Sequence, residues 1–410
     1  MAAKRTKRRP PGEGSVWQHS PGRYSIGYKV TDPDGSTRRI TRRRSAAGEH
    51  WTTHKAAAKA LREELSKLDR GEWADPSRQP VAAYLGEWLD GLRLTPGTVA
   101  SYRRNVRLHL VPYIGAVPLA SLTTARIDGM YRKLESSGRR GHDGELAGAA
   151  LSARTVRYVA TILHSALAAA VDSRRLAVNP AARAHPPTAK QARAPEMHPW
   201  TAGQLAAFLS WSAGHSADHA AWTVLAMTGM RRGELLALRW RDLSGSALAV
   251  RRSAGIVRDK GERGAVTEGP TKTDRPRVID LDPSTVAVLR ARRRERGGLA
   301  LELARDDALI FGDIEGRHRN PETFSRRFRL DTALCRETPA GTAVPPIRLH
   351  DLRHTHATLL LGSGVPVKVV SERLGHASPM VTLTVYAHVM PGNQRDAADL
   401  FAGLIKAAGT

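Results

Sequence analysis

The segment His350-Asp351-Leu352-Arg353-His354 combines two imidazoles and a guanidinium within five residues. Three other segments carry groups of the same kind. Residues 228–234 read TGMRRGE, residues 271–273 read TKT, and residues 374–386 hold a Gly-His pair ten positions before a tyrosine. The four segments together give a set of six candidate residues: Arg231, Lys272, His350, Arg353, His376 and Tyr386.

These six side chains suit the cleavage of a phosphodiester without a metal ion. Arg231 and Arg353 can each donate two hydrogen bonds to phosphate oxygens and stay charged. The two histidines can donate further hydrogen bonds or transfer a proton near neutral pH, and Lys272 can protonate the leaving 5′ oxygen. Tyr386 can attack the phosphorus and form a covalent 3′-phosphotyrosine.

Each residue also has an ordinary structural interpretation. Arg231 alone would be a surface helix residue, and Tyr386 alone would be a partly buried core residue. His350 and His354, four residues apart, also suit a zinc ion, but the third ligand that zinc needs is not evident. The occurrence of all six in order within one basic chain favours the chemical interpretation, which involves no metal and no cofactor.

Composition favours a polyanionic partner. The 410 residues include 64 Lys and Arg against 39 Asp and Glu, which gives a formal net charge of +25. An excess of this size is typical of nucleic-acid binding, and an anionic membrane surface is a weaker alternative. The single cysteine excludes an intrachain disulfide, and no segment predicts a secretory signal or a spanning helix. We therefore expect a cytoplasmic protein with no membrane partner.

Residues 1–76 are expected to form a basic tail and a small DNA-binding domain of one sheet and one helix. Period-two alternation and turn residues predict short strands at 15–17, 23–30 and 38–41. The helix that follows should end at Gly71 and bury a face made of Ala58, Leu61, Leu65 and Leu68. An arginine cluster in this block is a candidate DNA contact, with a charged edge strand as the alternative: Arg38, Arg39, Arg42, Arg43 and Arg44.

Residues 77–184 carry four amphipathic stripes, which predict a compact helical bundle. The arginines that lie off these stripes are its candidate DNA contacts: Arg103, Arg104, Arg107, Arg154 and Arg157. Residues 185–199 are rich in proline, which predicts an exposed, extended linker.

Residues 200–410 are expected to be mostly helical. Strand-like segments at 248–252 and 277–281 flank a polar hairpin region that carries Lys272. After Tyr386, a helical stripe of Leu400, Phe401 and Leu404 is a candidate to dock on a neighbouring protomer, or it folds back on its own domain. The whole chain is thus expected to be multidomain and mainly α-helical, with small β elements.

Residues 228–240, 349–358 and 374–389 resemble the two arginine boxes and the tyrosine box of the tyrosine recombinases, the phage-integrase family. The first two domains resemble, with weaker motifs, the arm-binding and core-binding domains of that family. The likeness therefore covers nearly the whole chain. It implies a β-sheet-plus-helix arm-binding domain, a helical-bundle core-binding domain and a mixed, mostly α catalytic domain.

The resemblance also implies a role for each of the six residues, and it assigns to Glu234 the support of the first box. By this resemblance, Tyr386 is the nucleophile, and Arg231 and Arg353 bind the phosphate. Lys272 is the general acid and His350 transfers a proton. His376 occupies a position at which the family has either histidine or tryptophan.

The expected function is site-specific recombination that integrates or excises a phage or integrative element through a Holliday junction. The N-terminal domain favours an integrase over an Xer-like resolvase, which the family builds without an arm domain. A type IB topoisomerase is a further alternative, and so is a non-enzymatic DNA-binding regulator with a helix-turn-helix that includes residues 367–375. The expected partners are double-stranded DNA at core and arm sites, other protomers in a homotetramer, and two candidate accessory proteins, a host DNA-bending protein and an excision directionality factor.

Overall fold

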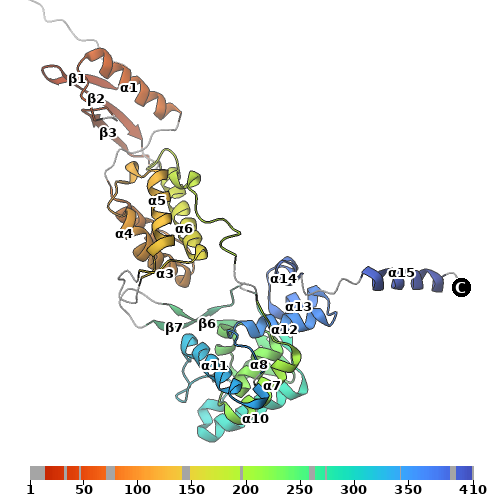
Figure 1. Ribbon diagram of the computed structural model, residues 1–410. Coiled ribbons are helices and arrows are strands. Elements are labelled where there is room, and N and C mark those ends of the chain that lie inside the picture. The colour runs from red at the N-terminus through yellow and green to blue at the C-terminus, as the bar shows by residue number, and fades with distance from the viewer. Residues whose placement is uncertain are drawn as a thin grey trace, which may run out of the picture. The chain divides into compact units, whose positions relative to one another are not determined.

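The computed structural model describes residues 14–31, 35–45, 48–70, 79–140, 148–193, 197–257, 264–272, 275–341, 343–387 and 394–408. The chain divides into two compact units, residues 1–194 and 195–410. Helices predominate in both and the sheets are small (Figure 1). The predicted class, mainly α with small β elements, is therefore confirmed. Within the described residues, no helix has the length and apolar character needed to cross a membrane.

The first unit begins with an antiparallel three-stranded sheet in the order β1 (Ser15–Ser20), β2 (Arg23–Thr31) and β3 (Thr37–Arg42). Alternate residues of β2 face α1 (His54–Asp69), so Ile26 and Tyr28 are buried with Leu61 of the helix. Thr53 caps α1 by accepting a hydrogen bond from a backbone N–H of its first turn. The predicted strands and helix are present. Residues 32–34, between β2 and β3, lie outside the described residues.

Two details of this sheet differ from the sequence prediction. Ser25 and Gly27 are buried as well, because Ser25 contacts His19 and the Trp17 ring leaves no room beside Gly27. In α1 the fully buried alanine is Ala57 rather than Ala58. The helix is therefore rotated slightly from the phase that the apolar pattern predicted.

The rest of the first unit is the predicted helical bundle. Its main helices are α2 (Val81–Asp90), α3 (Pro96–Asn105), α5 (Thr124–Ser137) and α6 (Ala153–Asp172). A π-helical turn, η1 (Val106–Leu110), continues α3 into the short α4 (Val111–Ile114). The bundle has its own apolar core, and the Tyr84 hydroxyl ties α2 to α6 by donating to the Ala166 carbonyl at 2.6 Å. The boundary at residues 76 and 77 stays a prediction.

The proline-rich segment after the bundle is less exposed than predicted. Pro187 is buried, and its carbonyl accepts a hydrogen bond from Arg157 Nη1 at 2.9 Å. The His185 backbone N–H donates to the Asp128 carboxylate at 2.7 Å. The first residues of the expected linker therefore pack on the helical bundle, because neighbouring polar groups satisfy their backbone.

The second unit is mostly helical. Its helices are α7 (Ala202–His215), α8 (His219–Thr228), α9 (Arg232–Leu236), α10 (Pro283–Leu299), α11 (Pro321–Arg336), α12 (Asp351–Gly362), α13 (Val367–Leu374), α14 (Pro379–Tyr386) and α15 (Gln394–Ala408). One small sheet has the order β4 (Leu243–Ser244), β5 (Ala247–Val250) and β8 (Arg277–Asp280), and β6 (Arg252–Val257) pairs with β7 (Ala265–Pro270) as a hairpin. The predicted strand region is thus present, and Lys272 lies between β7 and β8.

Two apolar clusters support this unit. The larger one is built on aromatic residues such as Trp200, Trp222 and Phe328. The smaller one joins α12, α13 and α14 through Leu361, Val370 and other side chains. The helices of the smaller cluster carry most of the candidate site, so the cluster fixes how those residues face one another.

Candidate active site

α12 presents two chemically different faces, because residues three or four apart lie on the same side of a helix. His350, the residue just before α12, and His354 lie on one face, and their rings meet edge to face with centroids 5.1 Å apart. Arg353 and His356 form the other, and both donate to backbone carbonyls at the end of α8. A single helix therefore supplies groups to two parts of the site.

Arg353 is a buried guanidinium with unused donor capacity. Its Nη1 donates to the Gly229 carbonyl at 2.8 Å, while its Nη2 is buried and has no hydrogen-bond partner among the described residues. Burial and the nearby charge of Arg231 lower the pKa of Arg353 to about 9. Gly229 adopts the left-handed conformation with φ of 62°, and a side chain there would collide with His356. The close approach of α12 to α8 therefore requires glycine.

Arg231 is held by a network of buried charges. The Glu234 carboxylate accepts from the Arg231 backbone N–H at 2.9 Å and from its Nη1 at 2.8 Å. Arg277 donates to the same carboxylate at 2.7 and 3.2 Å and to the Arg373 carbonyl at 3.0 Å. Burial alone would raise the pKa of Glu234, but the hydrogen bonds and charges of Arg277 and Arg231 outweigh it and lower the pKa. Glu234 therefore stays an anion that aligns two arginines.

His376 follows the left-handed Gly375 that ends α13. The Gly375 carbonyl accepts from Arg231 Nη2 at 3.3 Å, and a side chain on Gly375 would lie 2.7 Å from the Arg277 guanidinium. The His376 Nδ1 lies 2.7 Å from the hydroxyl of the buried Thr382 in α14. Burial, followed by the neighbouring arginines, lowers the pKa of His376 to about 4. The ring is thus neutral at pH 7 and fixed in orientation.

Tyr386 belongs to the smaller apolar cluster and is only 2% exposed. Burial raises the pKa of its hydroxyl to about 12. The hydroxyl lies 2.6 Å from Nδ1 of His354, whose own pKa is lowered by burial. Tyr386 is therefore both a core residue and the partner of an imidazole that sequence reasoning weighed only as a zinc ligand.

Lys272 differs from the other five predicted residues. It is exposed and makes no ion pair or hydrogen bond with any residue that the structure describes. Its neighbour Thr271 is buried, and the Thr271 hydroxyl donates to the Arg275 carbonyl at 3.3 Å. Arg231, His350, Arg353, His376 and Tyr386 gather around the ends of α8, α12, α13 and α14, whereas Lys272 stands apart from their contacts.

The chain is similar to known integrases. The model of the Phage integrase family matches residues 200–392. The ICEBs1 integrase of Bacillus subtilis is 30% identical over 187 residues, which are 45% of this chain and about half, 48%, of that integrase. The integrase of Mycobacterium phage D29 is 25% identical over 406 residues, which are 93% of each chain. Residues 200–392 belong to the phage integrase family of tyrosine recombinases.

A solved structure supports the fold of this recombinase. The Tn1549 transposon integrase, solved with a circular intermediate DNA, matches with a TM-score of 0.64 and 18% identity, over 78% of this chain and 98% of that one. The prediction of a site-specific DNA recombinase of the integrase type is confirmed by these relatives. The enzyme class predicted from the six residues, strand cleavage and rejoining, is confirmed with it.

Sequence reasoning missed two groups of the recombinase site, Arg277 and His354. The sequence pattern places Arg277 only in a strand, although its side chain donates to Glu234, which is 43 residues away in the chain. The sequence pattern indicates His354 only as a possible metal ligand with His350. The described residues contain no cluster of three or more ligating side chains that could hold a metal ion.

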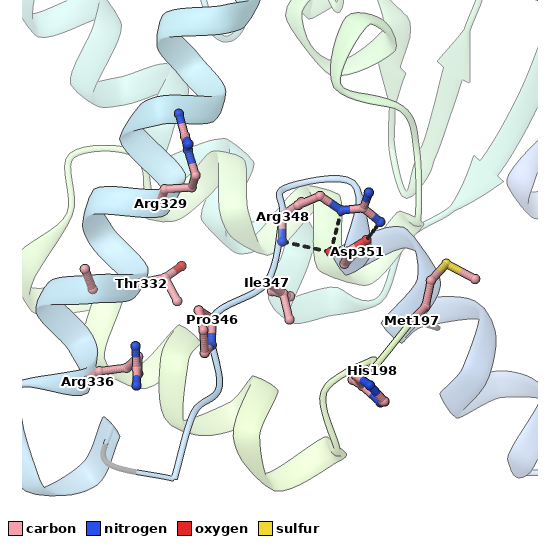
Figure 2. Close-up of a pocket in the computed structure, with 10 residues that line it drawn as sticks. Met197, His198, Arg329, Thr332, Arg336, Pro346, Ile347, Arg348 and Asp351 are labelled. Carbon is pink, nitrogen blue, oxygen red and sulfur yellow. Dashed lines mark hydrogen bonds and ion pairs between the residues drawn. The ribbon is translucent and has the colours of Figure 1, made fainter. Parts of the chain in front are cut away.

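A pocket of about 540 Å³ lies beside the second arginine box (Figure 2). Arg329, Thr332 and Arg336 of α11 line one side of it, and the Arg348–Asp351 ion pair, 2.8 Å long, lines another. None of the six predicted residues is among the described residues that line this pocket. The arginine pair with Tyr386, and not this hollow, is therefore the candidate active site.

Proposed function

We propose that Tyr386 attacks a DNA phosphodiester held by Arg231 and Arg353 and retains the 3′ end as a phosphotyrosine. The observation that carries this proposal is the buried, unpaired Nη2 of Arg353. A buried donor without a partner costs about 1–3 kcal/mol, and a phosphate oxygen would remove that cost. Glu234 fixes the second arginine in advance, so neither guanidinium has to reorganise as negative charge develops.

The remaining predicted residues, His350, His376 and Lys272, transfer protons and stabilise negative charge on the phosphate. His350 and His376 have lowered pKa values in the free protein, and the negative charge of a bound phosphate would raise both. Each can then donate to a phosphate oxygen. Lys272 would protonate the leaving 5′ oxygen when DNA occupies the site. Because the phosphotyrosine conserves the bond energy, rejoining needs no ATP, and the proposed chemistry needs no metal or cofactor.

The proposed substrate is double-stranded DNA, bound at a core site by residues 77–184 and 200–410 and at separate arm sites by residues 1–76. Arg104, Arg107 and Arg154 are exposed on the helical bundle and suit phosphate contacts. Two arginines of the N-terminal sheet have partners within the fold, since Arg39 lies over the Trp17 ring and Arg42 pairs with Glu64. Arm binding would therefore depend most on Arg43 and Arg44. Both are exposed, and within the described residues Arg44 donates only to the Gly48 carbonyl, at 3.2 Å.

Recombination of two duplexes cuts four strands, and one nucleophile per protomer implies a homotetramer on DNA. α15 is a candidate contact between protomers, because Phe401 and Ile405 are 66% and 59% exposed; the Leu400 and Leu404 side chains predicted for this stripe lie outside the described residues. A host DNA-bending protein and an excision directionality factor are proposed accessory partners. The proposed setting is the cytoplasm of a bacterial host, where the DNA substrate lies.

Covalent trapping of DNA tests this function. A nicked suicide duplex, built from the junction sequence of the element that encodes the chain, should give a protein–DNA adduct on a denaturing gel. The Tyr386→Phe variant should bind the duplex but give no adduct. Tyr113→Phe is the matched control, because the Tyr113 hydroxyl has no hydrogen-bond partner among the described residues and its loss should change nothing. An adduct from Tyr386→Phe would overturn the assignment of the nucleophile. EDTA should not reduce adduct formation by the unchanged protein, because the proposed chemistry uses no metal ion.

A further inference from the structure

The hydroxyl of Tyr386 contacts His354 and not the histidine that the family resemblance assigned to proton transfer. The distance from Tyr386 Oη to His354 Nδ1 is 2.6 Å. His350 instead meets His354 edge to face on the neighbouring turn of α12. His354 thus stands between the predicted histidine and the nucleophile.

The direction of this hydrogen bond follows from acid–base chemistry. A phenol is a good donor with one proton, and a neutral imidazole nitrogen is a good acceptor. Tyr386 is only 2% exposed, and among the described residues the His354 imidazole is the hydrogen-bond partner of its hydroxyl. Acid–base chemistry therefore favours a bond from the Tyr386 hydroxyl to Nδ1 of His354, which requires the tautomer with its ring hydrogen on Nε2.

A phenol in this environment needs a base before it can attack. Its pKa of about 12 leaves only a very small fraction as phenolate at neutral pH. The lowered pKa of His354 keeps the imidazole neutral and able to accept a proton at the same pH. The acceptor is already at hydrogen-bond distance, which is the geometric condition for general-base catalysis.

Resting on the proposed role of Tyr386, we propose that His354 is a catalytic residue, the general base that takes the phenol proton as the tyrosine attacks. The Tyr386 oxygen forms a bond to phosphorus, its proton moves to Nδ1 of His354, and the bond from phosphorus to the 5′ oxygen breaks. The 5′ oxygen takes its proton from the general acid. Rejoining reverses each step, so the imidazolium of His354 returns its proton to Tyr386.

The imidazolium that forms in this step would lie among both attractive and repulsive charges. Asp351, one turn earlier on α12, favours it, and the neighbouring arginines oppose it. The titratable and charged groups that face His354 come from α12, from the segment before it, from the loop after α13 and from α14: Arg348, His350, Asp351, Arg353, His376 and Tyr386. These groups are unchanged in the variants of His354 that test the proposal.

Single-turnover cleavage of the nicked suicide duplex, followed against pH, tests the role of His354. His354→Gln keeps a polar acceptor but cannot take a proton. At neutral pH its cleavage should slow about 10²-fold or more, since general-base catalysis contributes about 10²–10⁴-fold. His215→Gln is the matched control, because His215 is exposed and lies at the end of α7, away from the site.

The pH profile separates a base from a positioning role. The unchanged enzyme should cleave at a nearly constant rate from about pH 7 to about pH 8, because His354 is neutral there and Arg353, whose pKa is about 9, is still charged. In His354→Gln, only the phenolate reacts, so the rate should rise about tenfold per pH unit over the same range. A uniform loss with an unchanged profile would overturn the proposal.

A second substitution keeps the result independent of folding defects. Replacement of Tyr386 by 3,5-difluorotyrosine, a more acidic phenol of nearly the same shape, should restore much of the cleavage lost in His354→Gln at neutral pH. The same replacement should change the unmodified enzyme little. Equal effects in both backgrounds would overturn the role of His354. The Tyr386→Phe variant decides the nucleophile separately, since cleavage by that variant would refute the proposed function itself.

Discussion

The site has an arginine side, formed by Arg231 and Arg353, and a lysine side, formed by Lys272. The fold holds the two sides in different ways. Arg231 is fixed by Glu234, which Arg277 holds in turn, and Arg353 is bound to the Gly229 carbonyl. Lys272 is exposed and has no such partner within the described part of the chain. Groups that stabilise charge on the phosphate gain from being fixed in advance. A group that delivers a single proton can instead be positioned when DNA binds.

This difference has a physical cost on one side only. Fixing two arginines beside each other places like charges in a buried site, and the anion of Glu234 offsets part of that repulsion. Lys272 remains in solvent and costs the fold nothing. We therefore expect substitutions on the arginine side to lower both cleavage and stability, and substitution of the lysine to lower cleavage alone.

The largest expected loss is in Arg353→Ala. Removal of one donor to a developing oxyanion costs about 2.7–4 kcal/mol, so cleavage of the suicide duplex should slow about 10²–10³-fold. Binding to the same duplex in a mobility-shift assay should persist. The control Arg290→Ala, an exposed arginine of α10, should cleave normally. Normal cleavage by Arg353→Ala would remove the phosphate-binding role.

Acid should lower the free energy of unfolding through His356, which lies on the same face of α12 as Arg353. This buried imidazole contacts the Ala226 carbonyl and Arg373, and burial, followed by the charge of Arg373, lowers its pKa to about 4. The folded pKa lies below the unfolded value, so the stabilising contribution is present above about pH 6.5 and is lost as the pH falls toward about 4. The loss should reach roughly 3 kcal/mol.

Urea unfolding at a series of pH values measures this effect. His356→Gln cannot titrate, so its free energy of unfolding should fall less between about pH 6.5 and about pH 4 than that of the unchanged protein. Parallel curves for the two proteins would show that His356 does not contribute to acid sensitivity.

Arg277→Ala should destabilise the second unit by about 1.5–3 kcal/mol, the range for hydrogen bonds to a charged group. Glu234 keeps Arg231 but loses two of its hydrogen bonds. Cleavage should slow as well, because Arg231 becomes less well fixed. Arg317→Ala removes two exposed ion pairs, with Asp313 and Glu315, from the loop before α11. It should change stability by about 0.5 kcal/mol or less. Equal stability of the two variants would refute the anchoring role of Arg277.

Lys272→Ala should have the smallest effect on folding, within about 0.5 kcal/mol, since Lys272 is exposed. It should still slow the cleavage of ordinary DNA. DNA with sulfur in the 5′-bridging position should be cleaved at the normal rate, because a thiolate leaves without a proton. Lys368→Ala, another exposed lysine, is the control on both substrates. An equal loss on ordinary and sulfur-containing DNA would refute the general-acid role.

The sequence predicts the local features of this molecule better than its tertiary contacts. Strands β1 to β3 and the helices of the bundle follow from alternation, apolar stripes and turn residues. The six candidate residues follow from side-chain chemistry in four short segments. Contacts between distant segments do not: Arg277 and Glu234 are 43 residues apart, and His354 and Tyr386 are 32 apart. Both pairs depend on how α9, β8, α12 and α14 pack, which no local pattern encodes.

The most direct test of the account is to identify the residue that carries DNA. The adduct trapped on the suicide duplex would be digested with trypsin and its DNA-linked peptide sequenced by mass spectrometry. Cleavage after Arg373 and Arg395 gives residues 374–395, in which Tyr386 is the single tyrosine. We predict a 3′-phosphodiester on Tyr386 of this peptide. A linkage to another residue, or to the 5′ end of the cut strand, would contradict the account.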